Sequence, residues 1–74
     1  MAKGNGPAHT IRIGFVKATI WYNKNGDTGF YSVNVTRSYK GTDDKWADGD
    51  SFNHTDLLNA AKVLERAESW ISAQ

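Results

Sequence analysis

The chain has 74 residues, nine of them Lys or Arg and eight Asp or Glu, so its net charge at pH 7 is +1. This length has room for one small domain, which buries only about 60% of the surface of its unfolded chain. Cysteine is absent, which excludes disulfides and most structural zinc sites, and two histidines are too few for a histidine-rich metal site. We therefore expect no cofactor and no metal, and association with a second copy remains as a source of stability.

Residues 1–10 are rich in Gly and Pro, and we predict a flexible leader there, followed by a single domain over residues 11–74. No apolar run approaches the length of a transmembrane helix, and the leader has no hydrophobic segment of the signal-peptide kind. We expect an intracellular chain without membrane contact, and the lack of cysteine fits a reducing compartment.

The first predicted strand covers residues 11–22. Its apolar positions have a period of two and then shift by one residue: Ile11 and Ile13, then Val16, Ala18, Ile20 and Tyr22. A shift of this kind beside a glycine predicts a β-bulge near Gly14 or Phe15.

Residues 23–29 are turn formers, and Asn25-Gly26 is the strongest short hairpin signal. The second predicted strand, residues 30–40, should turn Val33 and Val35 inward. Residues 41–44 predict a second turn, and residues 45–52 hold one or two short strands.

A C-terminal helix is predicted after Asn53, a favourable N-cap, with Asp56 in its first turn. Its apolar arc is about 180° wide, whereas a helix needs roughly 100° to cover one sheet. The excess predicts a homodimer through the helix. The interface residues that we assign are Ala60, Val63, Leu64, Ala67, Trp70 and Ile71.

Charge is distributed unevenly along the chain. Residues 1–40 hold six bases and one acid, a net charge of +5, while residues 41–74 hold three bases and seven acids, a net charge of −4. Arg37 is in phase with Val33 and Val35, which favours a structural role, with a buried stem or a salt bridge across the dimer to Glu68.

The aromatic residues divide by face. Tyr22, Tyr31, Tyr39 and Trp70 fall on apolar faces, where core packing is expected. Trp21, Phe30 and Trp46 lie beside cations, an arrangement that suits single-stranded nucleic acid, although core-edge or interface packing fits each of them as well. We assign phosphate contacts to Arg12, Lys17, Lys24 and Lys40, stacking to Trp21, Phe30 and Trp46, and hydrogen bonds to Ser32, Asn34 and Thr36.

Metal binding and catalysis find little support in the sequence. Asp44 to Gly49 partly follows a calcium-loop opening, but its third and twelfth positions are Trp46 and Thr55, which favours an acidic turn. His54 stands next to Thr55 and Asp56 at the helix start, where these residues serve as capping groups rather than as a triad. We expect no catalytic residue and no enzymatic activity.

The order of elements resembles the DNA-binding domain of the transcriptional positive cofactor four family, which is related to the Whirly proteins. The resemblance covers about residues 11–72 and rests on the Ile13-Gly14 pair, the Arg37-x-Tyr39 strand end and the step from Ser51 to Asn53. It implies an α+β fold (ββββα), with a curved four-stranded antiparallel sheet before one C-terminal helix and dimerisation through the helices.

The resemblance also implies binding of single-stranded DNA across the sheets, in transcription, replication or recombination, with proteins of these processes as further partners. RNA is a second ligand of the same kind, and a bacterial or phage protein of the cytoplasm and nucleoid is expected. The family's sheet-facing bases and aromatics correspond to Arg12, Lys17, Trp21, Lys40 and Trp46. The chain departs from the family in its acidic residues, which stand where relatives are usually basic: Asp43, Asp44, Asp48 and Asp50.

Two other functions remain open from the sequence. A protein-interaction module would use Trp21, Phe30 and a sheet edge to recruit a polypeptide by strand addition, without nucleic acid. A structural or inhibitor-like dimer would present the acidic loop at residues 43–50 to a basic partner.

Overall fold

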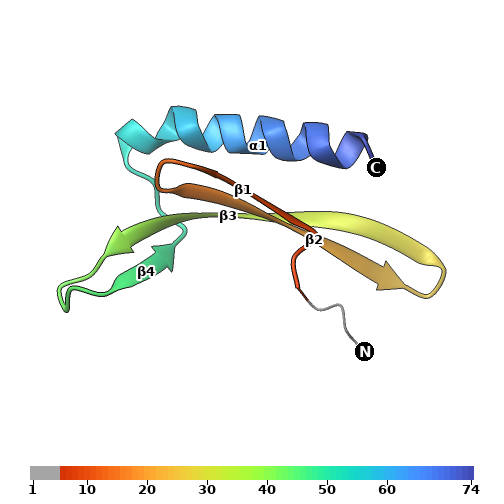
Figure 1. The fold of residues 1–74 in the computed structure, drawn as a ribbon, viewed down its shortest axis with the longest axis horizontal. Coiled ribbons are helices and arrows are strands. Elements are labelled where there is room, and N and C mark those ends of the chain that lie inside the picture. Colours follow the sequence, from red (N-terminus) through yellow and green to blue (C-terminus); the bar gives the residue numbers. More distant parts are fainter. Residues whose placement is uncertain (1–5) are drawn as a thin grey trace.

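In the computed structural model, which describes residues 6–74, a four-stranded antiparallel sheet is followed by one C-terminal helix (Figure 1). The strands β1 (His9–Ile13), β2 (Val16–Asn25), β3 (Thr28–Lys40) and β4 (Trp46–Gly49) lie in this order in the sheet. A short 3-10 turn, η1 (His54–Asp56), leads into the helix α1 (Leu57–Ser72). The predicted fold class, with a curved sheet before one helix, is confirmed.

The predicted first strand is in fact two strands joined by a tight turn. Ile13 pairs with Val16, so Gly14 and Phe15 form a two-residue hairpin loop. Gly14 has a φ of 60° and Phe15 has no positive φ, which is the pattern of a type II′ turn. The predicted β-bulge was wrong, because a reversal of the chain produces the shift in apolar phase.

The strand β1 begins two residues earlier than predicted. His9 pairs with Ile20 and Thr10 pairs with Thr19, so the end of the predicted leader belongs to the sheet. Of the rest of that leader, residues 6–8 are described, and the N–H of Ala8 donates to the carbonyl of Ile20 at 2.7 Å; residues 1–5 lie outside the described residues.

The hairpin of β2 and β3 is longer than predicted. Its pairing runs without interruption from Val16 and Arg37 to Asn25 and Thr28. The turn that we expected over residues 23–29 therefore contracts to Gly26 and Asp27, and Gly26 takes a φ of 65°. Because β1 pairs only as far as Ile20, residues 21–32 extend past it as a two-stranded arm (Figure 1).

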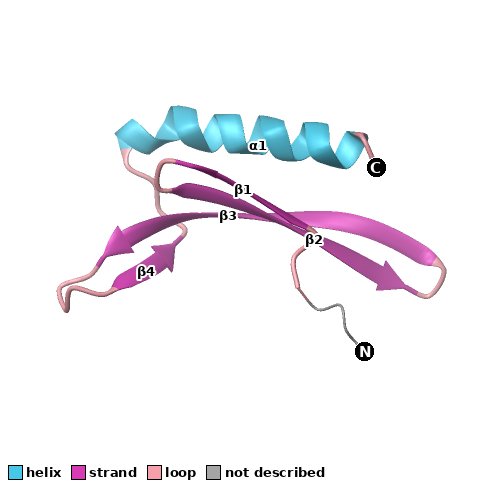
Figure 2. Ribbon diagram, viewed as in Figure 1, coloured by secondary structure: helices cyan, strands magenta, loops and turns pink. Residues whose placement is uncertain are grey.

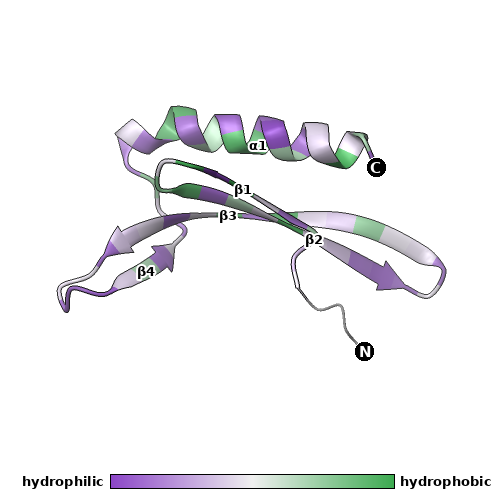
Figure 3. Cartoon of the chain, viewed as in Figure 1, coloured by the Kyte–Doolittle hydropathy of each residue, from purple (hydrophilic) through white to green (hydrophobic). Residues whose placement is uncertain are grey.

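The helix α1 lies along one face of the sheet (Figure 2). Alternation along β2 directs Val16, Ala18 and Ile20 to this face, where they are fully buried against Val63 and Ala67 of α1. Figure 3 shows the hydrophobic part of β2 beneath the helix and its hydrophilic end in the arm. In residues 6–74 no element covers the opposite face of the sheet.

A largely buried ion pair joins β3 to the start of the helix. The Nε atom of Arg37 donates a hydrogen bond to Oδ2 of Asp56 at 2.6 Å, and the backbone N–H of Asn53 donates to the same oxygen at 3.0 Å. Arg37 therefore has the predicted structural role, but its partner is Asp56 of the same chain rather than Glu68.

The aromatic residues expected in the core are only partly there. Tyr31 and Trp70 pack edge to face at 5.9 Å, and His9 stacks on Trp70 at 4.9 Å. The core prediction was wrong for Tyr22 and Tyr39, which are exposed. Tyr22 lies in the arm beyond β1, and Tyr39 lies where β3 and β4 bend away from α1 (Figure 1).

Candidate nucleic-acid interface

The sheet face opposite α1, here called the outer face, is where most of the predicted ligand residues meet. Residues paired across antiparallel strands point to the same face, so the row of Arg12, Lys17 and Thr36 crosses three strands. Other rows are Trp21 with Ser32, Asn23 with Phe30, and Lys40 with Trp46. With Asn34, which pairs with Thr19, the outer face contains the predicted ligand residues Arg12, Lys17, Trp21, Phe30, Ser32, Asn34, Thr36, Lys40 and Trp46.

Lys24 does not belong to this set. It pairs with Gly29 and is in phase with Ile20 and Tyr22, so it lies on the side of the sheet that carries α1. The structure therefore separates Lys24 from the other residues assigned to phosphate, because the strand β2 continues to Asn25 where we expected a turn, and a phosphate contact at Lys24 stays a prediction.

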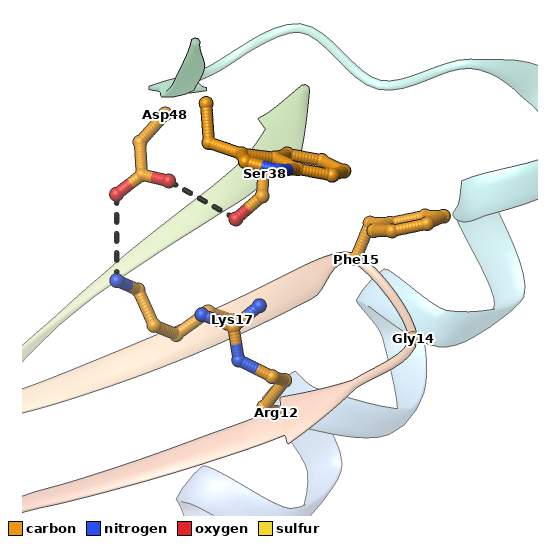
Figure 4. A pocket seen from close by; sticks show the side chains of 7 residues that line it. Arg12, Gly14, Phe15, Lys17, Ser38 and Asp48 are labelled. Atoms are coloured by element: carbon orange, nitrogen blue, oxygen red, sulfur yellow. Dashed lines mark hydrogen bonds and ion pairs between the residues drawn. The ribbon is translucent and has the colours of Figure 1, made fainter. Parts of the chain in front are cut away.

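The outer face is hollowed at the β1–β2 turn, next to β4. The cleft has a volume of about 440 Å³ and is lined by Arg12, Gly14, Phe15, Lys17, Ser38, Trp46 and Asp48. The rings of Phe15 and Trp46 stand 5.8 Å apart at 25° and both are exposed, Trp46 by 60%. Figure 4 shows Phe15 and the polar pair of Lys17 and Asp48 on either side of this cleft.

Sequence reasoning missed Phe15, Ser38 and Asp48 as parts of the site. Phe15 follows the glycine of the β1–β2 turn, and its carbonyl accepts a hydrogen bond from the N–H of Ser38 at 2.8 Å, which holds the turn against β3. The signal was available in the apolar shift at Gly14. A hairpin turn at that position would have placed Phe15 at an exposed tip.

Two of the predicted phosphate-binding cations already have carboxylate partners. Lys17 lies 3.4 Å from Asp48, and Lys40 lies 3.3 Å from Asp44. Arg12 makes no ion pair with any residue between 6 and 74. Arg12 is therefore the freest cation of the cleft, and a phosphate would compete with carboxylates for the two lysines.

Asp48 is held by two neighbouring side chains. The hydroxyl of Ser38 donates to Oδ1 at 3.1 Å, and Lys17 donates to Oδ2 (Figure 4). The Ser38 hydrogen bond, followed by the hydrogen bond and charge of Lys17, lowers the pKa of Asp48 below its ordinary value. The carboxylate is thus an ionised group that can only accept hydrogen bonds at neutral pH.

The predicted hydrogen-bond donors differ in their accessibility. Ser32 is exposed, and its hydroxyl accepts a hydrogen bond from Nδ2 of Asn23 at 2.9 Å. Asn34 is exposed as well. The Thr36 hydroxyl is covered and has no hydrogen-bond partner among residues 6–74, so, contrary to our prediction, Thr36 presents no donor at the surface.

The predicted dimer residues lie mostly within the chain's own core. Val63 and Ala67 are buried against the sheet, and Ala60, Trp70 and Ile71 pack against the same core. Leu64 is 50% exposed, and the exposed apolar residues Leu57 and Leu58, which we did not assign, accompany it. The expected excess of apolar surface on the helix exists, but it lies on the flank of Leu57, Ala61 and Leu64.

Within residues 6–74, no three His, Asp or Glu side chains gather in a way that could hold a metal ion. No helix in that part of the chain has the length and apolar character needed to cross a membrane.

Comparison of the chain with protein-family models found no match. Searches of curated proteins and of solved structures likewise found no match.

Proposed function

We propose that this protein is a non-enzymatic, homodimeric single-stranded DNA-binding protein that binds its ligand on the outer face. The observation that carries the proposal is the collection of three cations and four aromatic side chains on a sheet face that α1 does not cover. The cations are Arg12, Lys17 and Lys40, and the aromatics are Phe15, Trp21, Phe30 and Trp46.

The arrangement of these residues suits an extended strand of nucleic acid. Phe30 and Lys40 are ten residues apart on β3, which corresponds to about 33 Å. Aromatic rings stand at both ends of this path, Trp21 and Phe30 in the arm, Phe15 and Trp46 at the cleft. Cations attract phosphates and aromatic rings stack on unpaired bases, and proteins that bind single strands without sequence preference combine these two kinds of contact.

Dimerisation through α1 is part of the proposal. The flank of Leu57, Ala61 and Leu64 follows a spacing of four and three residues, which places these side chains in one line along the helix. The chain exposes 5343 Å², against about 4,500 Å² expected for a folded monomer of 8.2 kDa. A second copy packed on this flank would cover part of the excess, and it would leave both outer faces free.

Titration of a fluorescently labelled oligo-dT tests DNA binding. We expect a dissociation constant in the micromolar range or below. The logarithm of the association constant should fall by about 0.7 per phosphate contact for each tenfold rise in salt concentration. An absence of salt-sensitive binding at micromolar protein would refute the proposal.

Two neighbouring aromatic residues provide a matched pair of variants. Trp21 faces outward, while Tyr22 faces the helix side and is 54% exposed. We expect Trp21→Ala to weaken binding about tenfold and Tyr22→Ala to leave it nearly unchanged, since one stacked base contributes about 1–3 kcal/mol. Equal losses in the two variants, with native circular dichroism, would contradict binding of the bases on the outer face at Trp21.

A protein-interaction module is the second candidate, and one feature of the sheet favours it. The strand β4 pairs only with residues 37–40 of β3, so in residues 6–74 nothing pairs with that edge of β3 from Thr28 to Thr36. An open edge of this length can accept a peptide as an added strand. This function predicts no binding to oligo-dT and protection of the β3 amide protons from exchange when the partner binds.

A further inference from the structure

The cleft beside Phe15 and Trp46 has two chemically different walls. One wall consists of exposed aromatic rings, and the other of Lys17 and Asp48, whose carboxylate also accepts a hydrogen bond from Ser38. Figure 4 shows Arg12 next to Lys17 on the polar side. A planar group stacked on Trp46 would thus have its edge close to a paired donor and acceptor.

Asp48 is out of place on a surface that binds phosphate alone. Its carboxylate repels phosphate, and it neutralises one of the three outer-face cations. A carboxylate is, however, a pure hydrogen-bond acceptor, and its two oxygens have about four lone-pair sites in total. Ser38 and Lys17 each occupy one site, so one site on each oxygen remains for a ligand.

Among the bases, guanine matches this polar wall most fully. Its Watson–Crick edge presents two adjacent N–H donors, the ring N1 and the exocyclic N2, beside the acceptor O6. The two free sites of Asp48 can accept the two donors, and the ammonium of Lys17 lies 3.4 Å from Oδ2, near enough to donate to O6. Thymine offers one N–H between two carbonyl oxygens, so the second carboxylate oxygen would face an acceptor.

We infer that this cleft is a base-selecting subsite that binds guanine in single-stranded DNA, with Trp46 stacking on the base and the Asp48–Lys17 pair reading its edge. The inference rests on the proposed function and deepens it. Binding along the rest of the outer face remains sequence-tolerant, and guanine is preferred at one position. The lowered pKa of Asp48 supports this role, because only the ionised carboxylate accepts both donors.

The experiment compares short oligo-dT strands that carry one central substitution. The central base is thymine, guanine, adenine, cytosine, hypoxanthine or 7-deazaguanine, and one guanine per strand prevents quadruplex formation. We expect guanine to bind about tenfold more tightly than thymine, the discrimination of one good bidentate contact. Hypoxanthine, which lacks the N2 amino group, should lose most of the increase in affinity over thymine. 7-Deazaguanine is altered at position 7, away from the Watson–Crick edge, and should keep that increase.

Two aspartate variants make the test specific to the cleft. Asp48→Asn removes the acceptor charge and should abolish the guanine preference. Asp27→Asn makes the same charge change in the turn between β2 and β3, at the far end of that hairpin from the cleft, and should preserve the preference.

The possible failures can be told apart. Equal affinity of the wild-type protein for all strands overturns the guanine subsite and leaves DNA binding intact. A rise in affinity for every strand in Asp48→Asn, without a preference in the wild type, would show that Asp48 merely screens Lys17, and this also overturns the inference. If no strand binds at all, the proposed function itself fails.

Discussion

Asp56, at the start of the helix, anchors the helix to the sheet through its ion pair with Arg37 of β3. Asp56 is the charged side chain that the fold buries among residues 6–74, and its Oδ2 atom accepts hydrogen bonds from Arg37 and from the backbone of Asn53. A buried charge is tolerated only when it is paired in this way.

Replacing Asp56 with Ala should lower the free energy of unfolding by about 3 kcal/mol, because Arg37 would keep its charge without a partner. Chemical denaturation followed by circular dichroism measures the loss. Asp50→Ala is the control, since Asp50 is exposed and should change stability by less than about 0.5 kcal/mol. Equal effects of the two variants would contradict a structural role for the pair.

The pKa of Asp48 depends on two neighbouring side chains of the outer face, Ser38 and Lys17. The Ser38 hydrogen bond is the largest cause of its lowered pKa, and Lys17 is the next. Because the pKa is lower in the folded state, the carboxylate stabilises the fold at pH values above its unfolded pKa. That contribution is lost as the pH falls through the folded pKa.

We therefore expect Ser38→Ala to raise the pKa of Asp48 toward its ordinary value, and Lys17→Met to do the same. NMR titration of the Asp48 carboxyl carbon measures both shifts. The exposed Ser51 is the control position, and Ser51→Ala should leave this pKa unchanged. An Asp48 pKa that does not move in either cleft variant would show that its neighbours do not hold the carboxylate.

At the level of the secondary-structure elements, the helix has more apolar surface than the sheet covers. Val63 and Ala67 face the sheet, while Leu57 and Leu64 remain about half exposed on one flank. Leu58 is turned about 100° around the helix from Leu57, so it borders the flank rather than lying in its line, and it is 84% exposed. The helix thus offers a matched pair of exposed leucines, one inside the proposed dimer flank and one outside it.

If the flank forms the dimer, Leu64→Arg should shift the protein to the monomer, because two buried guanidinium groups would face each other across the twofold axis. Leu58→Arg should leave the dimer intact. Sedimentation equilibrium measures both, with circular dichroism to verify the fold. A wild-type chain that sediments as a monomer, or an equal effect of the two variants, would refute dimerisation through this flank.

At the scale of the whole molecule, the chain is extended rather than compact. Its radius of gyration is 14.1 Å, against about 11 Å expected for a compact domain of 74 residues. The arm of β2 and β3 and the bend that carries β4 away from α1 account for this shape (Figure 1). A curved sheet with one covered face leaves the outer face available.

The charge asymmetry of the sequence is reduced where the two halves of the chain meet. Asp44 and Asp48 of the acidic half lie beside Lys40 and Lys17 of the basic half. Carboxylates of the β3–β4 region therefore determine how many cations of the outer face are free of an ion pair.

Asp44→Asn should free Lys40 from its ion pair and strengthen oligo-dT binding a few-fold. The slope of the logarithm of the association constant against the logarithm of salt concentration should become steeper by up to about 0.7. Stability should hardly change, because exposed ion pairs contribute little. Fluorescence titration at several salt concentrations provides the slope. If Asp27→Asn steepens the slope equally, net charge rather than Lys40 is responsible.

Patterns in the sequence predicted the long hairpin, the C-terminal helix and the division of the hairpin residues between two faces, and the family resemblance implied the four-stranded sheet. Alternation in β2 and β3 is a local property with a period of two, so it assigned Trp21, Lys17 and the serine–asparagine face correctly. The helix was predicted equally well, from the helical spacing of its apolar residues and from the N-cap at Asn53. Turn positions were less well predicted, because Gly14 fits both a bulge and a two-residue turn.

Which side chains meet depends on the packing of the elements in space. Phe15, Ser38 and Asp48 come from three segments, and only the pairing of β2 with β3 and of β3 with β4 brings them to one cleft. Likewise, the position of α1 on the sheet determined that Val63 and Ala67 are core and that Leu57 is surface. Periodicity defines the faces of an element, but the contacts between elements depend on register and packing, which act between residues far apart in the chain.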